Sequence, residues 1–111
     1  MISVVHDNSR CKLTLKGHAG HGAYGHDLVC ASASILVYTL AAALENLQSE
    51  GLITGLSVSF LPGDAEVSCE IKEGSRDTIT RVFDTVGVGF RLLARDYPRN
   101  ISYQMTERNK G

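Results

Sequence analysis

One charge-free segment limits how this chain can fold. No Asp, Glu, Lys or Arg occurs from Leu28 to Leu44. A helix that crosses a membrane needs about 20 mostly apolar residues, whereas this run is shorter and contains side chains such as Cys30, Ser34 and Tyr38. The segment therefore predicts a buried helix or a subunit interface, and we expect no membrane association.

The predicted helix has recognisable ends. It runs from about Leu28 to Ser49, because Asp27 is a good N-cap residue and Gly51 is a plausible stop. Apolar residues recur along one face at helical spacing: Val29, Ala33, Leu36, Leu40, Ala43 and Leu47. A helix with so few polar positions is expected to be buried on more than one side, which a second subunit would provide.

The rest of the chain predicts two hairpins, a second helix and a last strand. Strands are predicted where β-branched or alternating apolar residues occur, over 2–6, 11–16, 56–61, 65–72 and 101–105. The second helix covers about 77–97, ends before Pro98, and contains Gly87 and Gly89, which predict close packing. The order β-β-α-β-β-α-β favours an α+β fold, a mostly antiparallel sheet of about five strands covered by two helices. With 111 residues, the chain is expected to form one domain, residues 1–111.

The balance of charges argues against nucleic acid as a partner, and the cysteines indicate the compartment. The chain has 11 basic and 12 acidic residues and a net charge of −1, so no direct nucleic-acid binding is expected.

Cys11 and Cys69 fall on the apolar sides of their strands, which predicts small core residues. Three cysteines cannot all pair within one chain, and the first residues lack a signal-peptide pattern. These features predict a reducing, cytoplasmic location.

The segment before the first helix contains most of the reactive side chains. Residues 17–26 include four glycines and three histidines, His18, His21 and His26. Cys30 follows the N-cap by three residues, where free backbone amides and the positive end of the helix dipole favour a thiolate. A thiolate beside a histidine is the arrangement of a cysteine nucleophile, and the free amides could stabilise an oxyanion. We expect residues 19–26 to become ordered only when an extended peptide binds.

The same residues are compatible with other roles. His18, His21, His26 and Cys30 read H-x2-H-x4-H-x3-C, and zinc accepts nitrogen and sulfur ligands, although the order matches no common zinc signature. Alternatively, Cys30 is a small buried residue and the histidines lie on a surface loop. The glycines also spell G-x-G-x-x-G, but no βαβ crossover follows and Asp27 would repel a phosphate, which argues against a phosphate-binding loop.

A family resemblance narrows these possibilities. The motif G-H-A, a short loop and then G-x-D-L-V-C-A-x-x-S, here from Gly17 to Ser34, resembles the hallmark of the ribosomal-processing cysteine proteases of the Prp family. The resemblance implies a homodimeric α+β protease without a cofactor or metal. Members of the family remove an N-terminal extension from a large-subunit ribosomal protein, and they cleave after a pair of phenylalanines.

The resemblance also assigns roles to the motif residues. Cys30 would be the nucleophile and His18 the general base and acid. Asp27 and Ser34 would support the site: Asp27 would orient His18 or only cap the helix, and Ser34 would donate to the thiolate or to the carbonyl of Cys30. Independently of the resemblance, the glycines and free amides predict an oxyanion-binding and mobile loop of Gly17, Ala19, Gly20, Gly22 and Gly25.

His21 and His26 match no fixed position of the family, so we expect these two histidines to matter least for activity.

The alternative function is a non-catalytic, ribosome-associated factor that binds a protein tail in the same groove. Selective alkylation of Cys30 distinguishes the enzyme from the binder, because an activated thiolate reacts fast at low pH.

Overall fold

The computed structural model describes residues 1–23 and 27–106, so Gly25 and His26 lie outside the described residues. Its helices and strands are, in chain order, β1 (Ile2–Asp7), β2 (Lys12–Lys16), α1 (Leu28–Ser49), β3 (Ile53–Leu61), β4 (Asp64–Ile71), α2 (Arg76–Asp96) and β5 (Ile101–Thr106). This order confirms the predicted α+β fold.

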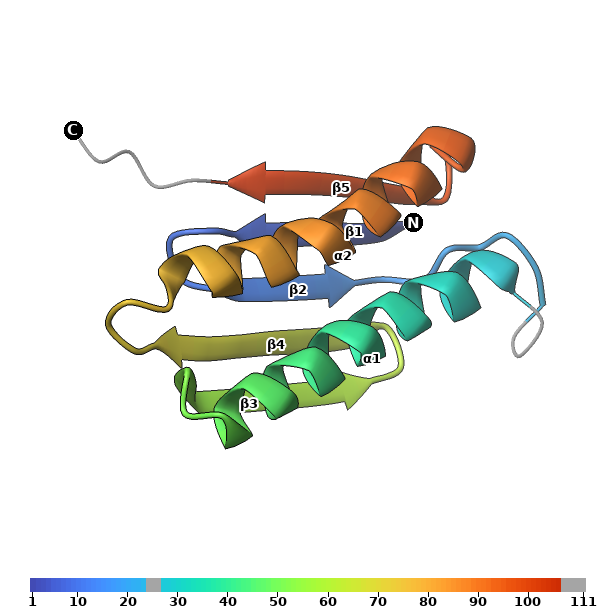
Figure 1. The fold of residues 1–111 in the computed structure, drawn as a ribbon. Helices are drawn as coiled ribbons and strands as arrows, with labels where there is room; N and C mark the ends of the chain where they lie inside the picture. The colour runs from blue at the N-terminus through green and yellow to red at the C-terminus, as the bar shows by residue number, and fades with distance from the viewer. Residues whose placement is uncertain (24–26, 107–111) are drawn as a thin grey trace.

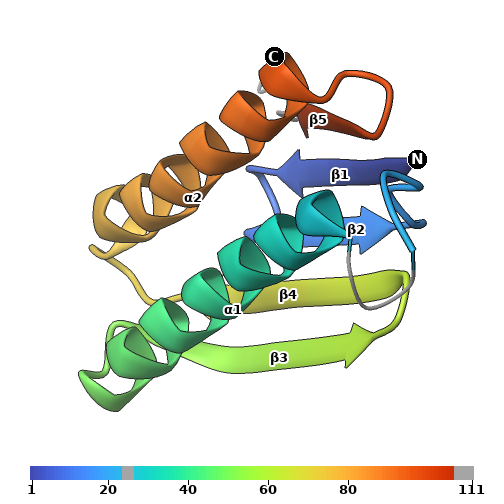
Figure 2. The same cartoon turned by 90° about the vertical axis from the view of Figure 1, so that its right-hand side faces the viewer.

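The five strands form one sheet in the order β3-β4-β2-β1-β5. Neighbouring strands pair antiparallel except β1 and β5, which run parallel with Ile2 opposite Ile101. A parallel pair needs a crossover connection, and α2 makes it just before β5 begins. Both helices cover the same face of the sheet (Figure 1, Figure 2). The prediction of a mostly antiparallel sheet is confirmed.

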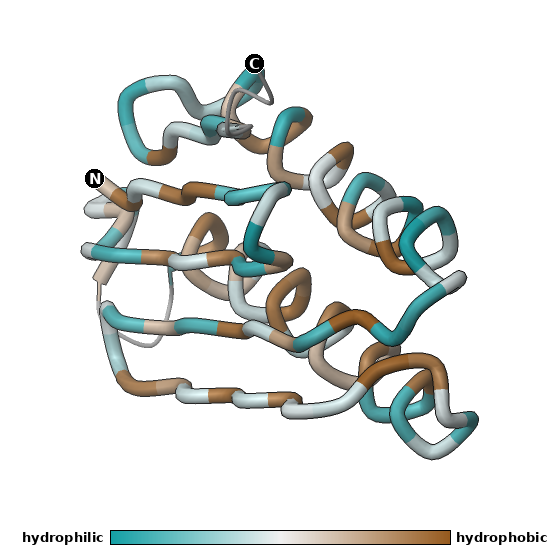
Figure 3. The backbone as a smooth tube through the Cα atoms, turned by 90° about the vertical axis from the view of Figure 1, so that its left-hand side faces the viewer, coloured by the Kyte–Doolittle hydropathy of each residue, from teal (hydrophilic) through white to brown (hydrophobic). Residues whose placement is uncertain are grey.

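The core lies between the sheet and the two helices. Apolar and polar residues alternate along the strands (Figure 3), so that Leu13 and Leu15 of β2 are buried whereas Lys16 is exposed. On the uncovered face, Lys12 forms an ion pair with Glu66 at 3.5 Å. The alternation thus separates an apolar face, which packs on the helices, from a polar face that meets water.

α1 begins and ends where predicted. Asp27 caps it, and Gly51, with a φ of +82°, follows its last turn. Its buried residues are Val29, Ala33, Val37, Leu40, Ala41 and Leu44. Val29, Ala33 and Leu40 of the predicted stripe are buried as expected. Leu36, Ala43 and Leu47 are only half-buried, because the core face is rotated toward Val37, Ala41 and Leu44.

The outer side of α1 is apolar as well. By length and composition alone, this helix could cross a membrane. In the fold, its inner side packs on the sheet, while Leu28, Ile35 and Tyr38 remain exposed. α1 is therefore covered on the sides that face the sheet and α2, whereas its outer side is not covered within a single chain.

α2 packs closely at its two glycines, against α1 at Gly89 and against β5 at Gly87. A Cβ added to Gly89 would lie 2.6 Å from Leu36 Cδ2, and one added to Gly87 would clash with the hydroxyl of Tyr103. The predicted close packing at both glycines is confirmed. The contact with α2 also explains why Leu36 does not face the sheet.

The strands differ from the prediction by one residue at several ends and by three residues at the start of β3. β3 begins at Ile53 instead of Leu56, because Gly55, with a φ of +62°, makes an irregularity that interrupts the alternation. Cys11 lies in the turn before β2 with a φ of +50°. Cys11 and Cys69 are each 6% exposed, which confirms that both are core residues.

Candidate active site

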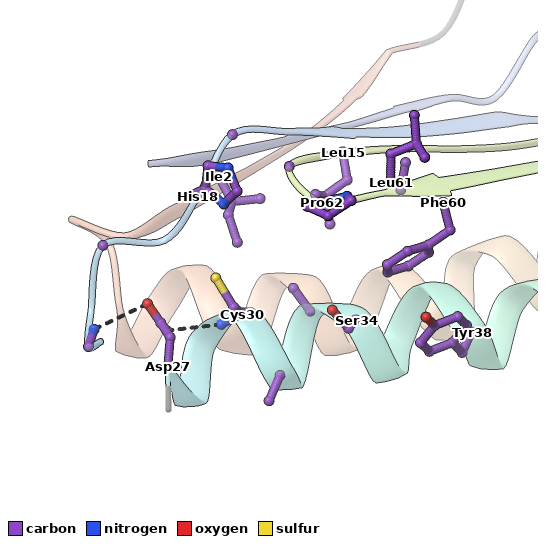
Figure 4. Close-up of a pocket in the computed structure, with 17 residues that line it drawn as sticks. Ile2, Leu15, His18, Asp27, Cys30, Ser34, Tyr38, Phe60, Leu61 and Pro62 are labelled. Atoms are coloured by element: carbon purple, nitrogen blue, oxygen red, sulfur yellow. Dashed lines mark hydrogen bonds between the residues drawn. The ribbon is translucent and has the colours of Figure 1, made fainter. Parts of the chain in front are cut away.

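A pocket of about 820 Å³ lies at the N-terminal end of α1. Its walls come from the first turns of α1, from the chain that leaves β2 and from the turn between β3 and β4 (Figure 4). His18, Asp27, Cys30 and Ser34 all line it. The fold therefore brings the predicted side chains to one pocket.

Cys30 is half-buried in the first turn of α1. Its N–H donates to Asp27 Oδ1 at 3.0 Å, and its sulfur accepts the N–H of Ala19 at 3.4 Å. The Ala19 N–H is thus directed at the sulfur atom that a nucleophilic cysteine would use. Both the position and the contact suit a nucleophile.

His18 reaches the pocket from the opposite wall. It follows β2, where the N–H of Gly17 donates to the carbonyl of Gly63 at 2.9 Å. The imidazole lies against Gly63, since a Cβ there would be 2.6 Å from Nε2. Figure 4 shows the ring on the side toward which the Cys30 sulfur points, but no hydrogen bond joins the two within the described chain. Hydrogen bonds between catalytic groups often tighten only when substrate binds.

Asp27 is occupied by backbone donors. Its Oδ1 accepts from the amides of Val29 and Cys30, at 2.9 and 3.0 Å. Its Oδ2 accepts from the amides of His21 and Gly22, at 2.8 and 3.1 Å. Burial alone would raise the pKa of this carboxyl, but the four donors outweigh burial and hold the pKa below its ordinary value of 3.8. Asp27 therefore caps α1 and fastens the loop, and within the described chain it makes no hydrogen bond to the imidazole of the predicted base.

Fewer amides are free for an oxyanion than the sequence suggests. The amides of Val29, Cys30 and Gly22 bind the carboxylate of Asp27, and the amide of Gly17 binds the turn after β3. Across residues 1–23 and 27–106, the N–H of Gly20 has no acceptor. Gly25 lies outside the described residues. Gly20 is thus the described loop glycine whose amide remains available.

The pocket continues from Cys30 along α1 toward an aromatic pair. Ser34, one turn after Cys30, lines the wall (Figure 4), but neither of its predicted hydrogen bonds is formed in the described part of the chain. Beyond it, Tyr38 stacks on Phe60 with ring centroids 4.4 Å apart and planes 13° apart. Both rings line the pocket, so this end suits an apolar or aromatic side chain.

His21 has a larger role than the sequence suggests. Its N–H binds Asp27, and its ring packs edge-on against Tyr97 with centroids 5.0 Å apart. Two residues earlier, the carbonyl of Ala19 accepts Asn100 Nδ2 at 2.9 Å. Ala19, His21 and Gly22 thus have partners within the fold. The ordering of residues 19–26 by a bound peptide stays a prediction.

The geometry gives no support to the zinc interpretation. The ring of His21 packs edge-on against Tyr97. Among the residues that the structure describes, no three His, Cys, Asp or Glu side chains are grouped to hold a metal ion. His26, the remaining member of the predicted set, lies outside those residues.

Comparison with known proteins identifies the family. A sequence model of the cysteine protease Prp family matches residues 1–102. The chain belongs to the Prp family of cysteine proteases. Within this family, the ribosomal processing cysteine protease Prp of Staphylococcus aureus is 26% identical over 100 residues, which cover 90% of this chain and 91% of the relative.

Solved structures share the fold. The crystal structure of S. aureus Prp with a covalently linked product peptide gives a TM-score of 0.77 at 24% identity, over 96% of this chain and 100% of that one. A structure of the same S. aureus protease with a substrate peptide gives 0.70 at 23% identity, over 96% and 100% of the two chains. The structure of SMU.848 from Streptococcus mutans gives 0.70 at 26% identity, over 96% and 93%. The likeness to the Prp fold therefore covers the whole sheet and both helices, beyond the loop and helix motif.

Two residues that line this Prp-family pocket, and a third that binds Ala19 beside it, carry little signal in the sequence. Phe60 lies in a predicted strand, Gly63 in a predicted turn, and Asn100 follows the second helix. Only the fold places them beside the segment that contains His18 and Cys30. The single local clue is the glycine at position 63, where a φ of +71° favours glycine.

Proposed function

We propose that this chain is a cysteine endopeptidase in which Cys30 is the nucleophile and His18 is the general base and acid. The main support is that both side chains line one pocket, with a backbone N–H already directed at the sulfur. The thiolate attacks the scissile carbonyl, and the N–H of Gly20 is a donor for the resulting oxyanion. His18 protonates the leaving amine, which leaves a thioester on Cys30. Water then loses a proton to His18, hydrolyses the thioester and restores the thiolate.

We infer that the substrate is the N-terminal extension of a large-subunit ribosomal protein in the cytoplasm. The relative from S. aureus is a ribosomal processing protease, and one crystal structure of S. aureus Prp contains a substrate peptide. The aromatic pair Tyr38 and Phe60 supports recognition of phenylalanine near the cleaved bond. A peptide that crosses this pair and then reaches Cys30 would be cut after its aromatic residues.

Incubation with the unprocessed ribosomal protein, followed by mass measurement of the products, tests the proposal. We expect one new fragment that ends in phenylalanine. Cys30→Ser should give no fragment, whereas Cys69→Ala, which changes a thiol outside the pocket, should still cleave. A Cys30→Ser protein that cleaves at the normal rate would exclude this mechanism. Stable binding without cleavage by the unmodified chain would instead identify a ribosome-associated binder of protein tails.

We further propose that the protein is a homodimer. Leu28 and Ile35 are 66% and 60% exposed on α1, and Val88 and Leu92 are also exposed on α2. Large exposed apolar side chains gathered on neighbouring helices are typical of an interface. Sedimentation velocity should therefore detect a dimer that Ile35→Asp converts to a monomer, whereas Val58→Asp on β3 should leave the dimer intact.

A further inference from the structure

Ala19 is held from two sides. Its N–H donates to Cys30 Sγ at 3.4 Å, and its carbonyl accepts Asn100 Nδ2 at 2.9 Å. Its side chain is buried. Asn100 is therefore linked to the sulfur of Cys30 through Ala19, although Asn100 and Ala19 are 81 positions apart in the sequence.

Asn100 is itself fixed in the turn between α2 and β5. Its N–H donates to the carbonyl of Tyr97 at 2.9 Å, and its carbonyl accepts the N–H of Ile2 at 2.8 Å. The turn is thus tied to the end of α2 and to the first residue of β1. A side chain that starts from such a fixed backbone can hold its partner in one place.

The same turn contacts the loop a second time. The ring of Tyr97 meets the ring of His21 edge to face, with planes 78° apart. The contacts at Ala19 and His21 lie on either side of Gly20, whose φ is +68°. Glycine gives a loop much rotational freedom, so the two contacts fix the direction of the Ala19 N–H from outside the loop.

We propose that Asn100 is a positioning residue for Cys30: it holds Ala19 so that the Ala19 N–H points at the sulfur and favours the thiolate. The inference rests on the proposed function, in which Cys30 is the nucleophile. A donor stabilises a charge most when it is in place before the charge forms, because no reorganisation is then needed. Asn100 lies outside the loop and helix motif, and its role follows from the fold.

The test measures ionisation of Cys30 directly, without substrate. Alkylation by iodoacetamide is followed by mass spectrometry as a function of pH in the unmodified protein, Asn100→Ala and Asn100→Asp. Asn100→Asp keeps the side-chain shape, but an ionised carboxylate cannot donate to the Ala19 carbonyl.

We expect iodoacetamide to alkylate Cys30 roughly three- to tenfold more slowly in both variants at about pH 6.5. At about pH 10, where the thiol is ionised in all of the proteins, the rates should be equal. Asn46→Asp, on the exposed side of α1, is the matched control and should keep the original profile.

Two results would overturn the proposal. One is an unchanged pH profile in the folded Asn100 variants. The other is full alkylation of Cys11 and Cys69 in native buffer in both variants, because Asn100 would then be needed for the fold and not for the site. Failure of the proposed function gives a different pattern: Cys30→Ser would still cleave peptide, while the alkylation profile of the Asn100 variants would still shift.

Discussion

The imidazole of His18 lies against the backbone of Gly63, where the Cβ of any other residue would come within 2.6 Å of Nε2. The carbonyl of Gly63 also accepts the N–H of Gly17 at 2.9 Å. The turn between β3 and β4 therefore limits how far the proposed general base can move away from Cys30.

Gly63→Ala is expected to lower kcat/KM at least about tenfold, because small displacements of a catalytic group are costly. The matched control is Gly51→Ala, since Gly51 has a similar φ of +82° but open space around it. Both variants should lose stability from the strained backbone, by about 1–2 kcal/mol, and only Gly63→Ala should lose activity. Peptide-cleavage kinetics and urea denaturation measure the two effects, and equal activities would show that Gly63 serves only the turn.

Asp27→Asn is expected to lower the free energy of unfolding by about 1–3 kcal/mol near neutral pH, because an amide cannot accept all four backbone N–H groups. Since folding lowers the pKa of Asp27 below 3.8, its contribution is present above that pH and is lost as the pH falls through the lower folded-state value. In urea denaturation, the difference from the unmodified protein should be constant from about pH 7 to 5 and shrink below about pH 4. Asp77→Asn, exposed in the first turn of α2, should change little. A difference that does not shrink in acid would contradict the role of the carboxylate.

In the folded protein, only Cys30 should react rapidly with iodoacetamide. The hydrogen bond from the Cys69 thiol lowers the pKa of Cys11 to about 7 and raises that of Cys69. Ionisation would make Cys11 reactive if reagent could reach it, so burial must provide its protection. Peptide mapping should find one adduct in native buffer and three in urea. A native adduct at Cys11 would show that β2 and β4 separate during the reaction.

Phe60→Leu is expected to raise KM for a phenylalanine-containing peptide about three- to tenfold with little change in kcat, because an aromatic pair contributes about 0.5–1.5 kcal/mol beyond its buried area. Tyr38→Phe, which keeps the stacked ring, should have the original KM. Steady-state kinetics with one peptide give both constants. An unchanged KM in Phe60→Leu would place the aromatic side chains of the substrate elsewhere.

Local signals in the sequence are sufficient to predict where α1 begins and ends, but not which elements pack around it. Asp27 and Gly51 mark its two ends, because a cap and a left-handed glycine act within one turn of the helix. The direction of Leu36 is not predictable in this way, since helical spacing cannot tell whether a residue faces the sheet or α2. The parallel pairing of β1 with β5 is likewise a long-range contact with no local signature.

The same contrast between local signals and long-range contacts applies to the candidate active site. His18, Asp27 and Cys30 lie in one short segment, so their residue types and spacing already suggest a cysteine nucleophile beside a histidine. Gly63 and Asn100 belong to distant turns, and neither turn pattern says which side chain it will meet. Sequence therefore predicts the groups proposed to react, whereas the groups that position them become visible only in three dimensions.

The pairing of β1 with β5 also has a consequence for synthesis of the protein. Asn100 binds both Ile2 and Ala19, and β5 follows it directly. A nascent chain that has not yet emerged past Tyr97 therefore contains Cys30 but lacks the contacts that hold Ala19. Since a domain generally folds as a unit during translation, we expect the contacts around Ala19 to form only after β5 has left the ribosome.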